Sequence, residues 1–359
     1  MSWLLLFALC FTLALLCGLL LTQLAVRFAP CCGLVDRPKS EGHKNHRTPT
    51  PVAGGLAMWG AFTVTLLTGL AAGKCMLSSE VQTVMQGLQS VWVQLLTFFT
   101  GATILMLMGL CDDRRAMAAK RKLFWQLAAA AGTALAGVRL LPGVLPLPLS
   151  IAVTTLWIVT VINAVNFFDN MDGLAGGTGA IAFFFLAAVA ICHHQYFVGM
   201  LNCAALGAVL GFLRFNLAPA RIFMGDSGSH FLGYLLAVAS ILTSYYRPAE
   251  APTFLPVLIP VFILAVPLID AVTVIIIRWR LHQPVYIGDN RHISHRFTRL
   301  GLSRPQAVLS VWLLSFIAGA GALALLWLPP FGAALILAQN LAITALVLLI
   351  QFCANKSEH

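Results

Sequence analysis

The chain has 359 residues, of which 60% are hydrophobic and only 9% are charged. Soluble globular domains carry about 25% charged residues, so this composition excludes an ordinary water-soluble enzyme and a disordered chain. A membrane-spanning helix uses about 20 apolar residues, which leaves room for about eleven helices joined by short loops. The net charge of +10 is interpreted as the basic loops of a membrane protein, and nucleic acid is not an expected partner.

Eleven apolar runs follow one another along the chain. The first has no basic residue before it and is too long for a signal peptide, so we expect it to be a span. The lengths of the runs predict an all-α integral membrane protein with one polytopic domain over residues 1–359. The runs cover residues 3–26, 53–73, 92–111, 123–141, 149–167, 174–192, 195–213, 230–246, 254–279, 306–328 and 331–353.

Charged residues are distributed unequally between two sets of loops. One set, with the adjoining helix ends and the C-terminal tail, holds 19 of the 22 Lys and Arg and nine of the twelve acids. Since Lys and Arg gather in cytoplasmic loops, we expect an outside N-terminus and a cytoplasmic C-terminus. That rule does not explain the acids, and their clustering predicts a cytoplasmic site for a cation and an anionic substrate. The loops of this set are 27–52, 112–122, 168–173, 214–229 and 280–305.

The first of these loops is basic and rich in turn-forming residues. It reads HKNHRTPTP over residues 43–51 and continues to a pair of glycines at 54–55. Side chains such as Lys44, together with the backbone N–H groups of the turn, suit phosphate binding. An ordinary basic cytoplasmic loop is the alternative, because charge bias alone places basic residues there.

Two adjacent carboxylates, Asp112 and Asp113, close the third apolar run. They are costly to bring together unless they share a cation or a proton. The pair therefore suits Mg²⁺ binding or general-base chemistry. The alternative is a solvated helix end that Arg114 and Arg115 neutralise.

The end of the fifth run is unusually polar. Asn163, Asn166 and Asn170 are spaced to share one face if the helix persists, and Asp169 and Asp172 follow the same spacing of three. Such groups are costly in lipid, so we expect them to line a cavity. A polar turn between two spans is the alternative, but it does not require this many polar groups.

Two later loops add further candidates. The sequence RIFMGDSGSH over residues 221–230 places Asp226 where a helix begins, and there it could hold a metal beside bound phosphate, or act as a helix cap. The sequence YIGDNRHISHRF over 286–297 brings His292, His295 and Arg296 together. These side chains suit pyrophosphate contacts, while a solvated basic loop is the alternative.

Asp270 lies inside the ninth apolar run. An acid within a membrane span is a functional candidate by default. Because it follows Pro267 by three residues, it could instead satisfy backbone groups that the proline frees.

The order of these motifs resembles one enzyme superfamily, the polyprenyl-phosphate N-acetylhexosamine-1-phosphate transferases of glycosyltransferase family 4. The resemblance extends from about residue 34 to about residue 306 and is strongest toward bacterial undecaprenyl-phosphate N-acetylglucosaminyl 1-phosphate transferases. That subgroup carries a His-Ile-His-His element, for which this chain has His292-Ile293-Ser294-His295. The phospho-N-acetylmuramoyl-pentapeptide transferases, which carry three consecutive His, are the second candidate.

The resemblance implies a phosphotransferase reaction. A lipid phosphate, undecaprenyl phosphate, attacks the β-phosphorus of a UDP-sugar, most simply UDP-N-acetylglucosamine, and UMP leaves. The lipid-diphospho-sugar then serves synthesis of a cell-envelope polysaccharide such as lipopolysaccharide. Mg²⁺ assists, with Mn²⁺ as an alternative ion. The protein is then expected in the bacterial inner membrane, among inner-membrane lipid, and a second copy of the chain is a further candidate partner.

The resemblance also implies roles for individual residues. Asp112 corresponds to the base or lipid-phosphate partner with Asp113 beside it, and Asp226 corresponds to the metal ligand, with Asn163 assigned to the same metal. Phe223 is expected to stack on uracil, and Lys120 to support the carboxylate pair. The residues expected to contact the substrates are Lys44, Lys120, Asn163, Asn166, Asp169, Asp172, Phe223, His292, His295 and Arg296.

A membrane transporter or flippase is the alternative from another class. Transport sites usually lie near the middle of the bilayer and draw on broken helices. Here the polar groups gather at the ends of the apolar runs that face the cytoplasm, and Asp270 alone lies deeper. This distribution favours an enzyme.

Overall fold

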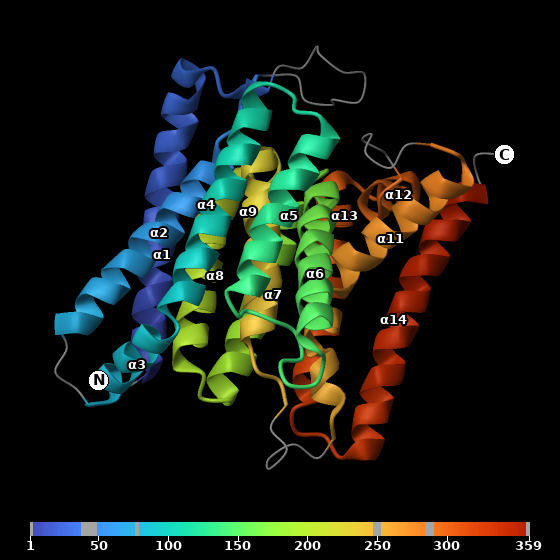
Figure 1. The fold of residues 1–359 in the computed structure, drawn as a ribbon. Helices are drawn as coiled ribbons and strands as arrows, with labels where there is room; N and C mark the ends of the chain where they lie inside the picture. Colours follow the sequence, from blue (N-terminus) through green and yellow to red (C-terminus); the bar gives the residue numbers. More distant parts are fainter. Residues whose placement is uncertain (1–2, 37–48, 76–78, 247–252, 284–290, 357–359) are drawn as a thin grey trace.

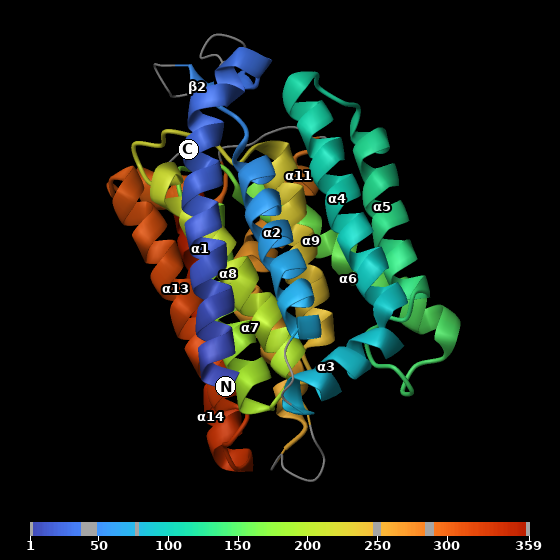
Figure 2. The same ribbon diagram turned by 90° about the vertical axis from the view of Figure 1, so that its left-hand side faces the viewer.

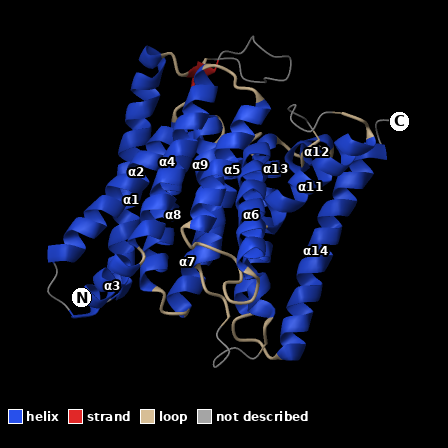
Figure 3. Cartoon of the chain, viewed as in Figure 1, coloured by secondary structure: helices blue, strands red, loops and turns tan. Residues whose placement is uncertain are grey.

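The computed structural model describes residues 3–36, 49–75, 79–246, 253–283 and 291–356. In that part of the chain the elements are helices and a pair of two-residue strands (Figure 3). Lys44 and Asp289 lie outside the described residues. The elements are α1 (Trp3–Phe28), η1 (Ala29–Cys32), β1 (Val35–Asp36), β2 (Thr50–Pro51), α2 (Gly54–Cys75), α3 (Ser79–Ser90), α4 (Trp92–Arg114), α5 (Ala119–Leu135), α6 (Leu147–Phe168), α7 (Leu174–Cys192), α8 (Tyr196–Asn216), α9 (Gly225–Leu242), η2 (Leu255–Leu258), α10 (Ile259–Ile263), α11 (Ala265–Arg280), α12 (Ile293–Arg299), α13 (Arg304–Ala324) and α14 (Pro330–Lys356).

Each of the eleven predicted apolar runs is helical, with ends that differ by several residues. Most of the helices lie roughly along one direction, and α1 begins at the end of the bundle opposite to the end where α14 finishes (Figure 1). The short helices α3 and α12 and the strand pair lie between the predicted runs. The strands pair antiparallel, with Val35 opposite Pro51 and Asp36 opposite Thr50.

Among the described residues, eight helices are long and apolar enough to cross a membrane, and the bent segment from η2 to α11 makes nine if it is one span. The two remaining predicted spans differ from these. Helix α5 has 17 residues and starts with three basic residues within its first turn, and α9 opens with the polar sequence GDSGS. The chain is thus an all-α, multi-pass membrane protein, while the count of eleven and the orientation stay predictions.

The outer and inner helices of the bundle expose different amounts of apolar surface. On α1 and α14, leucines such as Leu4, Leu20, Leu335 and Leu349 are more than half exposed. Helices α7, α8 and α9 are mostly buried at the centre. Because water-exposed leucines in such numbers would be unfavourable, this pattern indicates that α1 and α14 face lipid.

Small residues bring the central helices into close contact. A Cβ on Gly55 of α2 would lie 2.2 Å from the backbone nitrogen of Gly228 in α9, and one on Gly109 of α4 would lie 2.4 Å from the backbone of Asp226. Membrane helices approach closely where their side chains are small. The start of α9 is therefore held between α2 and α4 (Figure 2).

The chain bends by 68° between α10 and α11. The break falls at Leu264, and Pro267 follows in the first turn of α11. Proline lacks the N–H that a continuous helix would need, which accounts for the break between α10 and α11. The bend leads into α11, which contacts α6 and α13 and carries Asp270.

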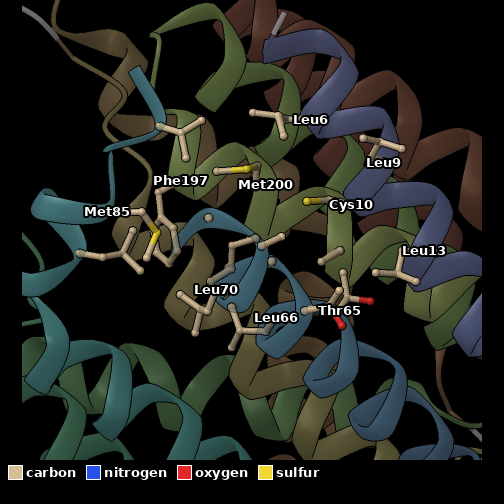
Figure 4. Close-up of a pocket in the computed structure, with 18 of the residues that line it drawn as sticks. Leu6, Leu9, Cys10, Leu13, Thr65, Leu66, Leu70, Met85, Phe197 and Met200 are labelled. Atoms are coloured by element: carbon tan, nitrogen blue, oxygen red, sulfur yellow. The ribbon is translucent and has the colours of Figure 1, made fainter. Parts of the chain in front are cut away.

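A cavity of about 290 Å³ lies between α1, α2, α3 and α8 (Figure 4). Leu6, Cys10, Leu66, Met85 and Phe197 are among the side chains that line it, and none of the lining residues is charged. It lies toward the end of the bundle where α1 begins (Figure 1).

Candidate active site

Three charged side chains from three helices meet at the end of the bundle where α4 finishes and α9 begins. Lys122 Nζ, in the first turn of α5, lies 2.6 Å from Asp112 Oδ2 of α4 and 2.7 Å from Asp226 Oδ2 of α9. All three side chains are partly shielded from solvent. The ammonium of Lys122 thus joins Asp112 to Asp226, and not to its neighbour Asp113.

Asp113 has a different environment from its neighbour. Its Oδ1 accepts the backbone N–H of Asp226 at 2.7 Å, and its Oδ2 accepts that of Ser227 at 3.1 Å. The first N–H groups of a helix have no partner within the helix, and a carboxylate there both bonds them and complements the helix dipole. Asp113 therefore caps α9 from another helix.

This arrangement argues against the helix-cap alternative for Asp226, while its role as a metal ligand stays a prediction. Since Asp113 supplies the cap, the side chain of Asp226 is available to Lys122 and Asn166. The backbone before it turns through Gly225 with φ of +70°, and a Cβ on Gly225 would lie 2.6 Å from Asp113 Oδ2. Glycine is needed at that position for both its φ and its size.

Asn166 is the asparagine that reaches the carboxylates. Its Nδ2 donates to Asp226 Oδ1 at 3.1 Å and to Ser229 Oγ at 2.8 Å. Asn163 instead donates to Gln126 Oε1 at 2.7 Å and to the carbonyl of Val159. Asn166, and not Asn163, therefore contacts Asp226, because the helical phase of α6 turns Asn163 toward α5; the assignment of Asn163 to a metal stays a prediction.

Lys120, predicted to support the carboxylate pair, is exposed at the start of α5. Lys122, two residues later, takes that position. The sequence Lys-Arg-Lys over 120–122 signals the charge, but not which of its members faces α4. Gln126 lies one turn after Lys122 on the same face of α5 and was not singled out from the sequence.

The turn after α6 distributes its polar groups over several neighbours. Asp172 Oδ2 accepts the backbone N–H of Ala220 at 3.0 Å, and Asn170 Oδ1 accepts the hydroxyl of Ser294 at 2.6 Å. Burial first, and then the negative charges of nearby acids including Asp226, raise the pKa of Asp169 to about 7. Asp169 thus lies in the field of the carboxylate cluster.

The end of the first loop is joined to the loop before α9. The backbone N–H of Phe223 donates to the carbonyl of Pro51 at 2.8 Å, and the N–H groups of Gly54 and Gly55 donate to the carbonyls of Phe223 and Met224. Phe223 is half-buried in this junction. The two glycines therefore serve close approach of α2 to α9.

The late histidine loop forms the short helix α12. His292 Nδ1 lies 2.6 Å from Asp270 Oδ2, and Ser294 ties α12 to Asn170. Arg296 is fully buried, and its Nε donates to the carbonyl of Arg291 at 2.7 Å. The guanidinium therefore holds the turn that precedes α12.

His295 lies on α12 and is half-buried. Burial first, and then the positive charges of His292, Arg304 and Arg299, lower its pKa to about 4, while Asp270 opposes this shift. The imidazole is neutral at pH 7 and can offer one donor and one acceptor.

The ends of α4, α5, α6 and α9 thus bring two acids, a lysine and an amide to one point at the end of a membrane bundle. In the described part of the chain, no group of three or more His, Cys, Asp or Glu is arranged to hold a metal ion by itself. The fold and the site together define a multi-pass membrane protein with a charged site at one end of its bundle.

Comparison with known proteins identifies the family. Residues 95–244 match glycosyl transferase family 4. A Bacillus subtilis (strain 168) protein named "Probable undecaprenyl-phosphate N-acetylglucosaminyl 1-phosphate transferase" is 33% identical over 337 residues, covering 89% of this chain and 86% of the relative. The decaprenyl-phosphate N-acetylglucosaminephosphotransferase of Mycobacterium tuberculosis (strain H37Rv) is 31% identical over 348 residues, covering 88% of this chain and 81% of the relative.

A relative of the second predicted kind also matches. The phospho-N-acetylmuramoyl-pentapeptide-transferase of Desulforudis audaxviator is 28% identical over 313 residues, 79% of this chain and 86% of the relative. The chain belongs to glycosyl transferase family 4 and is a phosphotransferase of that family. The resemblance seen in the sequence motifs is thereby confirmed.

Proposed function

We propose that this protein transfers N-acetylglucosamine 1-phosphate from UDP-N-acetylglucosamine to undecaprenyl phosphate. A phosphate oxygen of the lipid forms a bond to the β-phosphorus of the donor, and the bond from that phosphorus to the bridging oxygen breaks. UMP leaves with the bridging oxygen. The observation that carries the proposal is the cluster of Asp112, Lys122, Asp226 and Asn166 at one end of the bundle.

That location suits two substrates of different origin. A lipid phosphate reaches the site from the membrane surface, while a nucleotide sugar arrives from water. The helix ends at a membrane face are where both can meet. Transporters usually bind their substrates near the middle of the bilayer. Asp112 and Asp226 lie instead at the ends of their helices.

Charge balance supports a metal ion. Asp112 and Asp226 carry two negative charges against one positive charge of Lys122, and both substrates are anions. Phosphoryl transfer requires these charges to be neutralised and the reacting groups aligned. Oxygen ligands of this kind suit Mg²⁺, which is commonly held by one or two carboxylates together with substrate phosphates. We propose Asp226 and Asp112 as its ligands, with Mn²⁺ as a substitute.

Mg²⁺ would stabilise charge on the phosphates when bound. Lys122 neutralises the carboxylates and contacts phosphate oxygens. A phosphate monoester has its second pKa near 6, so at pH 7 the lipid phosphate is mostly deprotonated. Asp112, whose Oδ1 accepts the backbone N–H of Met117 at 2.6 Å, therefore acts mainly by fixing the lipid phosphate and the cation.

The neighbouring elements supply the donor pocket. Asp169 and Asp172 lie in the turn after α6, and we propose that this turn contacts the nucleotide sugar. Phe223 stacks on uracil, and His292 and His295 of α12 contact the pyrophosphate. The Ser294–Asn170 hydrogen bond supports this proposal, because it joins α12 to the turn after α6.

We further propose eleven spans, with α5 and α9 counted beside the bent segment and the eight long helices. The N-terminus then lies outside and the site faces the cytoplasm of a bacterial inner membrane. Two observations support this orientation. The start of α1 and the finish of α14 lie at opposite ends of the bundle (Figure 1). Basic residues stand where α1 and α4 finish and where α5 begins.

The test is UMP release by the purified full-length protein in nanodiscs with undecaprenyl phosphate and Mg²⁺. A panel of UDP-sugars, including UDP-N-acetylglucosamine and UDP-N-acetylmuramoyl-pentapeptide, is compared. We expect UMP only with the N-acetylhexosamine donors, and most with N-acetylglucosamine. UMP release with the pentapeptide donor alone would assign the protein to peptidoglycan synthesis. If none of the UDP-sugars gave UMP, the proposal would be contradicted.

A further inference from the structure

Asp270 is a buried acid whose role the reaction scheme above leaves open. It lies on α11, past the bend, and its side chain is only 1% exposed. Its Oδ2 lies 2.6 Å from His292 Nδ1, and its Oδ1 accepts the backbone N–H of Ile293 at 2.7 Å. Both carboxylate oxygens are thus directed at the start of α12, 22 and 23 residues further along the chain.

These two contacts fix both the position and the rotation of His292. The bond to the backbone of Ile293 places the start of α12 on α11, and the bond to Nδ1 sets the plane of the imidazole. A third contact, from Ser294 Oγ to Asn170 Oδ1 at 2.6 Å, ties α12 to the turn after α6. Helix α12 is therefore held between α11 and the polar turn that neighbours the carboxylate cluster.

A carboxylate bound to one ring nitrogen of histidine decides what the other nitrogen can do. The carboxylate accepts, so Nδ1 must carry a hydrogen. Nε2 is then the nitrogen that can face a substrate, and its orientation is set by the bond at Nδ1. Catalytic and metal-binding histidines are commonly oriented by such a carboxylate partner.

We propose that Asp270 is a positioning residue that acts through His292. It keeps a hydrogen on Nδ1, so that Nε2 of the imidazolium can carry the second hydrogen and donate it to the donor pyrophosphate. The inference rests on the role of His292 in the proposed function. The competing explanation is that Asp270 only anchors α12, in which case the ring nitrogen would not matter.

Asp270→Asn separates these explanations. Asparagine has the shape of aspartate and can still accept the N–H of Ile293 through Oδ1. Its Nδ2 donates, however, so Nδ1 of His292 must become the acceptor, and the ring then carries hydrogen on Nε2 alone and loses the positive charge that attracts the pyrophosphate. Loss of a partner of this kind typically costs roughly 10–100-fold in activity. We expect a loss in that range in kcat for UMP release.

A double-mutant cycle tests whether the effect passes through His292. In a His292→Ala background, Asp270→Asn should cost less than about 3-fold, because coupled residues are not additive. Thr273→Val on the same helix is the matched control, since its hydroxyl donates only within α11, to the carbonyl of Ile269. That variant should keep wild-type kcat. Thermal melting of all variants in the same nanodiscs reports their folding.

A measurement on the wild-type protein covers the case in which Asp270→Asn does not fold. Nitrogen-15 NMR of the ¹⁵N-histidine-labelled protein, with His292 assigned by comparison with the His292→Ala variant, reports which ring nitrogen carries hydrogen. We expect a protonated Nδ1. Hydrogen on Nε2 alone would overturn the inference.

The outcomes also separate this inference from the proposed function. If His292→Ala keeps wild-type activity, the proposed role of His292 fails and the positioning role fails with it. If His292→Ala loses activity and the double variant loses the product of the two single-variant losses in kcat, the proposed function stands and Asp270 is only an anchor for α12. A loss that is large alone and small in the His292→Ala background supports the positioning role.

Discussion

Asp113 of α4 accepts the backbone N–H of Asp226 at 2.7 Å, so that one acid caps the helix whose first turn presents the other. The two adjacent carboxylates of α4 therefore have separate tasks. Asp112 contacts Lys122, while Asp113 bonds the start of α9 with both oxygens. This division explains why the chain places two acids side by side at a membrane helix end.

The first prediction contrasts these neighbours. Asp113→Ala removes the cap of α9 and should lower the free energy of unfolding by about 1–2 kcal/mol, the usual cost of a lost cap. Asp112→Ala should abolish most UMP release and lower the melting temperature less than Asp113→Ala does, because Lys122 keeps Asp226 as its partner. Thermal melting and activity are measured on both variants. Equal melting temperatures for the two would show that Asp113 is not a structural cap.

The second prediction concerns Lys122. Lys122→Gln leaves Asp112 and Asp226 facing each other without their shared cation. We expect UMP release to fall by roughly 100-fold, the usual loss when a group that stabilises developing charge is removed. Lys120→Gln is the matched control, because Lys120 is exposed. Its activity should stay within about twofold of wild type, as for most exposed charges. A greater loss for Lys120→Gln than for Lys122→Gln would contradict the site described above.

The third prediction tests the packing that positions α9. Gly55→Ala would place a Cβ 2.2 Å from the nitrogen of Gly228, so α2 and α9 must separate. Overpacking of this kind costs about 1–3 kcal/mol, and displacement of Asp226 should also reduce kcat. Gly69→Ala on the same helix meets no atom within 4 Å and serves as the control. Thermal melting and kcat should be unchanged for Gly69→Ala, and unchanged values for Gly55→Ala would refute the close contact.

The fourth prediction is a pH effect on stability. The pKa of His295 in the folded protein is lowered to about 4, below its value of about 6.5 in an unfolded chain. The unfolded state then binds more protons between these two values, so stability falls as the pH decreases from about 6.5 toward 4. His295→Gln should reduce the difference between melting temperatures at pH 7 and pH 5. An unaltered difference would mean that His295 titrates normally.

The apolar runs predicted the long helices well, because hydrophobic length is a local property of the sequence. They did not reveal α3 or α12. Helix α3 is mostly polar and buries only a few apolar side chains, such as Val81 and Leu88. The bend before Pro267 was also not predicted, since proline is tolerated in many membrane helices.

The site was partly readable from the sequence. Asp112 and Asp226, both named from the sequence, share Lys122 as an ion-pair partner, and Asn166 donates to Asp226. The choices between Lys120 and Lys122 and between Asn163 and Asn166 depend on helical phase relative to a neighbour. Asp113 caps a helix that starts 112 residues later in the chain, and no local pattern signals a contact over that distance.

The most direct test of the central claim follows radiolabelled phosphate from the β-position of UDP-N-acetylglucosamine in nanodiscs that hold the full-length protein and undecaprenyl phosphate. We predict that the label moves into the lipid in step with UMP release. Transfer should stop when EDTA removes divalent cations, return with Mg²⁺, and fall by at least roughly 100-fold in Asp226→Asn, since that change removes charge at the site of phosphoryl transfer. Full turnover by Asp226→Asn, or no label in the lipid with any wild-type preparation, would contradict the account.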